Sequence, residues 1–342
     1  MVLRNDHQLT LKQQVAMIVV ITMIIVAGIL LFAAGYNESF YSDNEQVRSV
    51  FEAITNLGSD VLFLVLLSLI YLSYDKRFGR RLCYVFFFMV YATDFLKEFF
   101  QDPRPPANIE REEPYTSWGF PSGHTTTTIT FYGYIMLSHI GERRYRFPLI
   151  ILCMFPIIVV PISRMVIGVH DLQDVVGGAV IALSILLAYM VFLPRAATVV
   201  KAWSVERQMA VGVSVAMLLW VIGGLILTAR HSGDLLVALE ETAMGAGLLL
   251  GCAIAFPLEE AYVDYRPETM ARKDRMVAAI IGLPMTIVVY VVLSMVSDDI
   301  LPGYAADLLT YSVLILVLTL LVPYLLTRFV VERGPSISKE GS

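Results

Sequence analysis

Apolar segments of about twenty residues recur along the chain and are separated by short polar connections. Residues 15–35, for example, contain no charged side chain. A helix of this length and composition can cross the hydrocarbon core of a bilayer. We therefore predict ten membrane-spanning helices. They cover residues 14–36, 55–74, 80–100, 122–140, 147–168, 171–193, 208–229, 234–256, 275–296 and 304–327.

The composition agrees with a protein that lies mostly in a membrane. Hydrophobic residues make up 57% of the 342 residues and charged residues 16%, whereas an average globular domain has about 25% charged residues. The mean hydropathy is +0.70. Ten helices of ~20 residues leave about 13 residues for each connection, which is too short for a separate soluble domain. The predicted fold is an all-α, polytopic transmembrane helical bundle.

Charge and cysteine usage exclude several other classes of protein. The net charge of −5 is mild and no run of like charges is present, so the sequence indicates no nucleic-acid partner. The cysteines, Cys83, Cys153 and Cys252, all fall in apolar segments, which excludes a disulfide framework and a CxxC metal site. The first apolar segment is too long for a signal-peptide core, and we expect a retained helix. The sequence does not indicate the oligomeric state.

The distribution of lysine and arginine predicts the orientation of the bundle. Of the 25 Lys and Arg residues, 19 fall on the side of the N-terminus. Positive charge is enriched on the cytoplasmic side of membrane proteins, so both termini are predicted to be cytoplasmic. The other side, predicted to be extracytoplasmic, holds Arg48, Lys97, Arg104, Arg111, Arg164 and Arg230.

Three polar segments are predicted to meet on that extracytoplasmic side. The third predicted helix ends in KEFFQDPRPP, the fourth begins with PSGH, and the junction of the fifth and sixth has the sequence SRMVIGVHDLQD. In an up-and-down bundle these segments lie at one membrane surface. The candidate residues are Lys97, Arg104, Ser122, Gly123, His124, Ser163, Arg164, His170 and Asp174.

The spacing of these residues has a chemical meaning. His170 and Asp174 are four residues apart, so on a helix they share one face. A carboxylate there accepts the proton of one imidazole nitrogen and fixes which nitrogen is free. Arg164 and His170 are six apart, about 240° around a continuous helix, so the chain must break near Gly168 if both face one ligand.

The PSGH segment has the features of an anion site at a helix start. Ser122 can cap the helix, and the free N–H groups of the first turn together with the helix dipole attract an anion. Gly123 lets an oxygen atom approach the backbone closely. Lys97 and two arginines supply the point charge and the forked donors that suit a phosphate dianion.

At these positions the sequence resembles the type 2 phosphatidic acid phosphatase (PAP2) superfamily. The three-part pattern is Lys-x6-Arg-Pro, Pro-Ser-Gly-His and Ser-Arg-x5-His-x3-Asp, in this order and with these spacings. The superfamily includes undecaprenyl-diphosphate phosphatases, glucose-6-phosphatase, sphingosine-1-phosphate phosphatases and soluble vanadium haloperoxidases. The resemblance covers about residues 55–193. It implies a six-helix catalytic core within residues 1–200, followed by a four-helix extension in residues 201–342.

The resemblance also implies a role for each candidate residue. His170 is the expected nucleophile, which forms a phosphohistidine and is oriented by Asp174. His124 is the expected acid that protonates the leaving group. The phosphoryl oxygens are expected to contact Lys97, Arg104, Ser122, the Gly123 backbone, Ser163 and Arg164. This chemistry requires no metal and no cofactor.

The implied function is hydrolysis of a phosphomonoester or diphosphate of a lipid, such as phosphatidic acid, a sphingoid-base phosphate or a prenyl diphosphate. The four C-terminal helices, including the stretch SGDLLVALEETAMGAG, are similar to sphingosine-1-phosphate phosphatases. Two alternatives stay open. A phosphotransferase would use the same site, and a transporter or flippase would suit ten helices with Glu240 and Glu241 in the eighth, although no paired inverted repeats are present.

Overall fold

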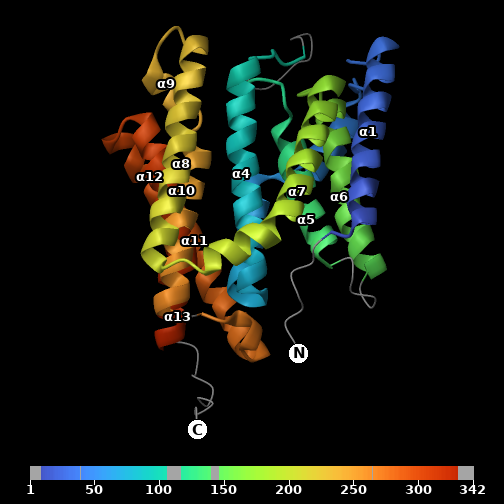
Figure 1. The fold of residues 1–342 in the computed structure, drawn as a ribbon. Helices are drawn as coiled ribbons and strands as arrows, with labels where there is room; N and C mark the ends of the chain where they lie inside the picture. Colours follow the sequence, from blue (N-terminus) through green and yellow to red (C-terminus); the bar gives the residue numbers. More distant parts are fainter. Residues whose placement is uncertain (1–8, 39, 106–116, 140–145, 264, 330–342) are drawn as a thin grey trace.

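The computed structural model describes residues 9–38, 40–105, 117–139, 146–263 and 265–329, and these form a bundle of helices without a strand (Figure 1). The predicted all-α fold is confirmed.

The helices fall into an N-terminal and a C-terminal series. The first comprises α1 (Leu11–Ala33), α2 (Glu45–Thr55), α3 (Asp60–Leu69), α4 (Lys76–Phe100), α5 (Gly123–His139), α6 (Arg146–Val166) and α7 (Leu172–Lys201). The second comprises α8 (Val205–Leu227), α9 (Leu235–Glu240), α10 (Ala243–Leu258), α11 (Arg272–Ile300), α12 (Gly303–Leu316) and α13 (Val322–Phe329).

The helices have the lengths and apolar surfaces of a multi-pass membrane protein. Within the described ranges, eight helical segments are long and apolar enough to cross a membrane. The two other predicted spans are also helical: α4 carries charged residues at both ends, and α5 is only 17 residues long. Large apolar side chains of α1, such as Met23 and Leu30, are about two-thirds exposed, which suits contact with lipid chains.

The second predicted span differs in detail from the structure. The prediction places its start at residue 55, but α2 ends there. Residues 56–59 interrupt the α-helix before α3 begins. Ser59 has extended backbone angles, and its hydroxyl accepts the N–H of Leu62, so it caps α3. Hydropathy did not reveal α2 because this amphipathic helix carries charged residues along one side.

The core of the N-terminal series surrounds α5, which packs against α4, α6 and α7. Aromatic rings fill the contact with α3 and α4: the ring centroids of Phe63 and Phe131 are 4.8 Å apart, and those of Phe63 and Phe86 are 5.0 Å apart. These rings are fully or almost fully buried. Burial of aromatic side chains contributes strongly to packing, so this cluster fixes α4 and α5 relative to each other.

The C-terminal series is joined to the N-terminal series through α10, which packs against α4, α8 and α12. Gly245 lies so close to α4 that an added Cβ would be 2.5 Å from the Cα of Tyr91. At the other end of α4, the buried Lys76 ammonium lies 3.0 Å from a carboxylate oxygen of the buried Glu259. Close backbone packing and a buried ion pair therefore hold the two series together.

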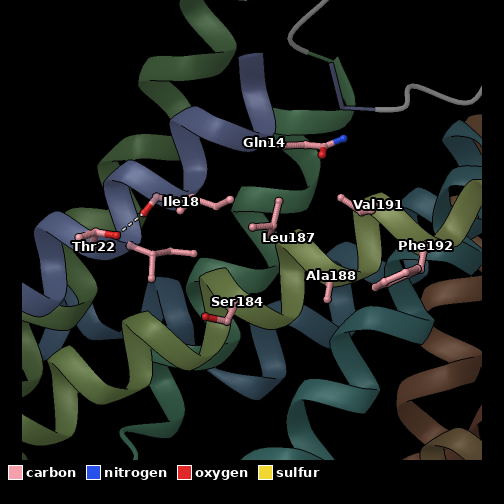
Figure 2. A pocket seen from close by; sticks show the side chains of 9 residues that line it. Gln14, Ile18, Thr22, Ser184, Leu187, Ala188, Val191 and Phe192 are labelled. Atoms are coloured by element: carbon pink, nitrogen blue, oxygen red, sulfur yellow. Dashed lines mark hydrogen bonds between the residues drawn. The ribbon is translucent and has the colours of Figure 1, made fainter. Parts of the chain in front are cut away.

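An apolar groove of about 430 Å³ lies between α1 and α7 (Figure 2). Ile18, Leu187 and Phe192 are among its lining residues. The Thr22 hydroxyl donates to the carbonyl of Ile18, and Gln14 donates to the carbonyl of Leu9, so these polar groups are satisfied locally. The groove therefore presents mainly carbon surface and contains none of the candidate site residues.

The alternation of helix directions places the polar connections at one end of the bundle. The C-terminal end of α4 and the N-terminal end of α7 lie at the end opposite to the beginning of α1 and the end of α13 (Figure 1). The three predicted polar segments therefore share one surface of the bundle.

Candidate active site

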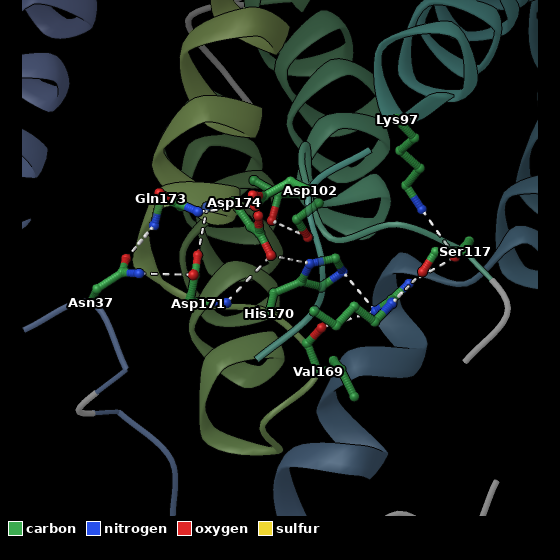
Figure 3. A network of polar contacts seen from close by, with 12 residues as sticks. Asn37, Lys97, Asp102, Ser117, Val169, His170, Asp171, Gln173 and Asp174 are labelled. Carbon is green, nitrogen blue, oxygen red and sulfur yellow. Dashed lines mark hydrogen bonds and ion pairs between the residues drawn. The ribbon is translucent and has the colours of Figure 1, made fainter. Parts of the chain in front are cut away.

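Three segments from different helices form a polar network at this end of the bundle (Figure 3). They are the last turn of α4 with residues 101–105, residues 117–124 leading into α5, and residues 163–174, which comprise the last turn of α6, the connection and the first turn of α7. All nine predicted site residues lie in these segments.

His170 and Asp174 form a buried pair at the start of α7. Nδ1 of His170 lies 2.9 Å from Oδ2 of Asp174, and the two side chains are only 2% and 1% exposed. The carboxylate accepts the Nδ1 proton, so the ring's lone pair is on Nε2. The structure thus joins the two residues, but not on one helix face: His170 precedes Asp171, the N-cap of α7, and only Asp174 lies in the helix.

The charge state of His170 follows from its surroundings. Burial lowers the pKa of His170 well below its usual value, and the positive charges of Arg104, Arg164 and Lys97 lower it further. The ring is therefore neutral at pH 7 and stays neutral into mildly acidic solution. A reaction that needs the free Nε2 lone pair should fail only when the pH falls through this lowered pKa.

The turn between α6 and α7 brings Arg164 and His170 together. Helix α6 ends at Val166, and Gly168 has a φ of +76°, in the left-handed region that glycine adopts readily. The backbone N–H groups of Val169 and His170 both donate to the carbonyl of Arg164, at 3.1 and 3.2 Å. The break expected near Gly168 is present, and it reverses the chain around Arg164.

Arg104 connects the nucleophile candidate to the loop before α5. Its Nη1 donates to the carbonyl of Val169 at 2.9 Å and lies 3.3 Å from Nε2 of His170. Its Nε and Nη2 donate to the carbonyl and the hydroxyl of Ser117, each at 2.8 Å. The guanidinium is therefore held on both sides, with one edge directed at the free imidazole nitrogen.

Lys97 lies beside the start of α5. Its Nζ donates to the Ser117 hydroxyl at 3.4 Å, and a Cβ added to Gly123 would be 3.9 Å from the same nitrogen. The ammonium therefore lies near the first residue of a helix, where backbone N–H groups have no partner within the helix. An anion between the two would be stabilised by the ammonium and by the helix dipole.

Ser122 is fully buried and packs against α7. Its N–H donates to the carbonyl of Asp174 at 3.1 Å, and its hydroxyl accepts from the Thr125 hydroxyl at 3.0 Å. An added Cβ on Gly178 would meet the Ser122 carbonyl at 3.2 Å, so α7 passes very close to this backbone. Ser122 thereby ties the start of α5 to the backbone of Asp174, the residue whose carboxylate orients His170.

The remaining predicted residues lie in α5 and α6. Arg164 is buried in the last turn of α6, and its Nη1 donates to the Thr55 hydroxyl at 3.1 Å. His124 lies in the first turn of α5, close enough to influence the charge of His170. The buried Ser163 hydroxyl donates to the carbonyl of Val160 at 2.6 Å, so its proton is engaged within its own helix.

The structure adds Ser117, Glu98 and His231, which the sequence did not indicate. Ser117 binds both Arg104 and Lys97, but no motif marks it. Trp118 donates its indole N–H to the buried Glu98 carboxylate at 3.1 Å, and His231 from the C-terminal series lies 3.3 Å from the same oxygen. These contacts depend on the conformation of the connections between helices, so the spacing of residues within one helix cannot predict them.

The donor set suits an oxyanion. Arg104 lies 3.3 Å from the free nitrogen of the neutral imidazole, and the positive charges of Arg164 and Lys97 also lower the pKa of that ring. Forked guanidinium donors match the oxygen atoms of a phosphoryl group, whereas the same cations would repel a divalent metal ion.

Two parts of the chain match known protein families. Residues 78–197 match the PAP2 superfamily, and residues 242–334 match the transmembrane extension of PAP2 superfamily phosphatases. The chain carries a PAP2 superfamily domain. This PAP2 domain contains all nine predicted site residues, and the extension corresponds to α10 through α13.

Curated relatives of this chain include sphingosine-1-phosphate phosphatases. A probable sphingosine-1-phosphate phosphatase of Dictyostelium discoideum is 31% identical over 158 residues, which are 42% of this chain and 38% of that protein. Human sphingosine-1-phosphate phosphatase 2 is 26% identical over 161 residues, 45% of this chain and 40% of that protein. The match therefore spans about two-fifths of the length of these relatives.

A solved structure is also similar to part of the bundle. It is a PAP2-type phosphatidylglycerolphosphate phosphatase from Bacillus subtilis, 20% identical, with a TM-score of 0.43 over 53% of this chain and 96% of that chain.

Proposed function

We propose that this protein is an integral-membrane lipid phosphate phosphatase that works through a phosphohistidine. The observation that carries the proposal is the state of His170: a neutral ring whose Nδ1 is held by Asp174 and whose free Nε2 lies 3.3 Å from the Arg104 guanidinium. A nucleophile and a phosphate-binding cation are thus side by side.

In the proposed first step the phosphoryl group enters between Nε2 of His170 and the cations. Arg104, Arg164 and Lys97 neutralise the charge on its oxygen atoms, which is the main contribution a protein makes to phosphoryl transfer. Nε2 attacks phosphorus, the P–N bond forms, and the bond from phosphorus to the lipid oxygen breaks. Asp174 stabilises the positive charge that develops on the imidazole.

His124 is proposed to transfer the proton in both steps. The negative charge of the bound phosphoryl group stabilises the imidazolium form of His124, which then protonates the leaving lipid oxygen. The neutral His124 next accepts a proton from water as the water oxygen attacks phosphorus. The P–N bond breaks, inorganic phosphate forms, and His170 is restored.

A lipid phosphate fits the position of this site. The cations lie at one end of a bundle with apolar outer surfaces, so a headgroup phosphate can reach them while the lipid chains stay in the bilayer. The two curated relatives described above are named as sphingosine-1-phosphate phosphatases, the first of them as a probable one. A sphingoid-base phosphate is therefore the first substrate to test, with phosphatidic acid and prenyl diphosphates next.

Phosphate release from a lipid panel tests the proposed function. The purified protein should release phosphate from sphingosine-1-phosphate in mixed micelles with a kcat/KM at least about tenfold above that for phosphatidic acid, phosphatidylglycerol phosphate or farnesyl diphosphate. Equal rates across the panel would contradict the substrate assignment, and release from none would contradict the activity. Transfer of labelled phosphate to an acceptor lipid instead of water would identify a phosphotransferase.

We further propose that the site faces the extracytoplasmic side, because most Lys and Arg residues fall at the opposite end. Of the six exceptions, Arg111 lies outside the described residues. Labelling of single cysteines in intact cells tests this orientation. Asp43→Cys, in the exposed connection between α1 and α2, should react with an impermeant thiol reagent.

Ala202→Cys, exposed at the other end of α7, should react only after the membrane is permeabilised. The native cysteines provide little background because all three are buried. The opposite labelling pattern would overturn the orientation.

A further inference from the structure

The connection between α1 and α2 reaches into the nucleophile site, although it lies outside the matched PAP2 domain. Asn37, in this connection, contacts the first turn of α7 in three ways (Figure 3). Its carbonyl accepts the N–H of Leu172 at 3.0 Å, its Oδ1 accepts the N–H of Gln173 at 3.1 Å, and its Nδ2 donates to Oδ2 of Asp171 at 2.8 Å.

These contacts complete the cap of α7. The first N–H groups of a helix have no partner within the helix. Asn37 satisfies those of Leu172 and Gln173, and Oδ1 of Asp171 accepts the third, from Asp174, at 3.0 Å. Asp171, the N-cap residue, is itself held by the Asn37 amide. The orientation of this whole turn therefore depends on a residue more than a hundred positions away in the sequence.

The same turn carries the carboxylate that orients the nucleophile. Oδ2 of Asp174 accepts from Nδ1 of His170 at 2.9 Å and from the backbone N–H of Asp171 at 3.4 Å. A small rotation of the first turn would move this oxygen away from the imidazole. Misplacement of a reacting group by about 1 Å can cost ~100-fold in rate, so the cap has a direct consequence for catalysis.

A second series of hydrogen bonds runs from the first turn of α7 to the segments that contain Arg104 and Ser117. Nε2 of Gln173 donates to Oδ2 of Asp102 at 2.9 Å, and the carbonyl of Asp102 accepts the N–H of Gly119 at 2.7 Å. Asp102 is two residues before Arg104, and Gly119 is two residues after Ser117. The turn that Asn37 caps is therefore linked both to the nucleophile and to the segments that hold the phosphate-binding cation.

We propose that Asn37 is a positioning residue for the phosphoryl-transfer site, which aligns the His170–Asp174 pair through the first turn of α7. The inference rests on the proposed function, and it assigns to the segment before the PAP2 domain a part in that reaction. Asn37 touches neither the substrate nor the reacting atoms, and acts through Asp171 and the α7 backbone.

The pH dependence of activity separates positioning from a merely structural role. Burial and the nearby charges of Asp102 and Glu38 raise the pKa of Asp171. The hydrogen bonds from the Asn37 amide and from the backbone N–H of Asp174 lower it. Without the Asn37 amide, Asp171 takes up a proton at higher pH. The charged carboxylate is the effective cap of α7. Without the Asn37 amide, activity should therefore be lost at a higher pH than in the wild-type protein.

The test compares Asn37→Ala with Asn44→Ala. Asn44 caps α2 in the same connection, where its Oδ1 accepts the N–H groups of Gln46 and Val47. The two substitutions therefore remove similar capping contacts, but only Asn37 faces the site. We expect Asn37→Ala to lower kcat by ~10- to 100-fold with a smaller change in KM, and to move the acid limb of kcat/KM to higher pH. Asn44→Ala should leave the acid limb unchanged.

Equal losses in the two variants with identical pH profiles would overturn the inference. If Asn37→Ala does not fold, Asn37→Asp serves in its place, because it keeps an oxygen for the Gln173 N–H and removes only the donor to Asp171. The inference then requires the acid limb of kcat/KM to move to higher pH, and an unchanged acid limb would overturn it.

Orthovanadate binding provides a measurement that does not depend on lipid turnover. Vanadate can form a bond to a free imidazole nitrogen and adopt the geometry of the phosphoryl-transfer transition state, so its affinity reports the alignment of His170. Asn37→Ala should bind it at least about tenfold more weakly than Asn44→Ala does. If the wild-type protein binds vanadate but hydrolyses no lipid phosphate, the proposed function fails while this difference still tests Asn37. Equal vanadate affinities would overturn the positioning role.

Discussion

Replacing His170 with alanine is expected to reduce phosphate release by at least about a thousandfold, because loss of a covalent nucleophile removes the reaction path itself. The residual rate would come from binding and charge stabilisation alone. The ring is small and lies in a turn, so the bundle should still fold. Phosphate release and trapping of a labelled phosphoenzyme measure the effect; the trapped species should be stable in alkali, labile in acid and absent from the variant.

His139→Ala is a matched control for this substitution. His139 is the last residue of α5, at the other end of that helix, and its ring contacts the hydroxyl of Tyr74. Its removal should leave turnover near the wild-type level. Asp174→Asn should lose less than His170→Ala, because the nucleophile survives but its free nitrogen is less well defined. Substantial turnover or a trapped phosphoenzyme in His170→Ala would contradict the nucleophile assignment.

Arg104→Lys is expected to lower kcat/KM by ~100- to 1000-fold although it keeps the positive charge. The guanidinium contacts Val169 and Ser117 through three different nitrogens while one edge lies beside His170. A lysine has a single nitrogen and cannot make these contacts together. The loss would show that the fixed position of the guanidinium, and not its charge alone, is needed for turnover.

Arg48→Lys is the control for Arg104→Lys. Arg48 lies on α2 at the same end of the bundle, where it donates to the hydroxyl of Tyr41 outside the site. The same exchange there should change kcat/KM by less than about twofold, as expected for an isolated surface contact. A similarly small effect of Arg104→Lys would show that charge alone suffices.

Within the connections between helices, some features could be predicted from the sequence and others could not. The expected break near Gly168 could be inferred because Arg164 and His170 would otherwise face different sides of one helix. Ser117 and Asn37 gave no such signal. Each acts through contacts to backbone groups or side chains of distant segments, and neither belongs to a periodic pattern.

The amphipathic helix α2 shows a second limit. Its charged residues hide it from a search for apolar segments, yet its last residue, Thr55, accepts a hydrogen bond from Arg164. The predicted eighth span shows a related limit, because it is divided into α9 and α10 at residues 241–242. Hydropathy reports the preference of a segment for lipid and does not report where its helix breaks.

The sequence by itself determined the helical membrane bundle and the group of residues at the site. A segment's preference for lipid is a local property, and in a bilayer the backbone of such a segment must satisfy its hydrogen bonds internally as a helix. The pairing of His170 and Asp174 is likewise local, since only three residues separate them across the start of α7. Only the tertiary structure decided how Ser117 holds the cations and how Asn37 caps α7. Those contacts join segments distant in the sequence, and their geometry depends on the packing of several helices and connections at once.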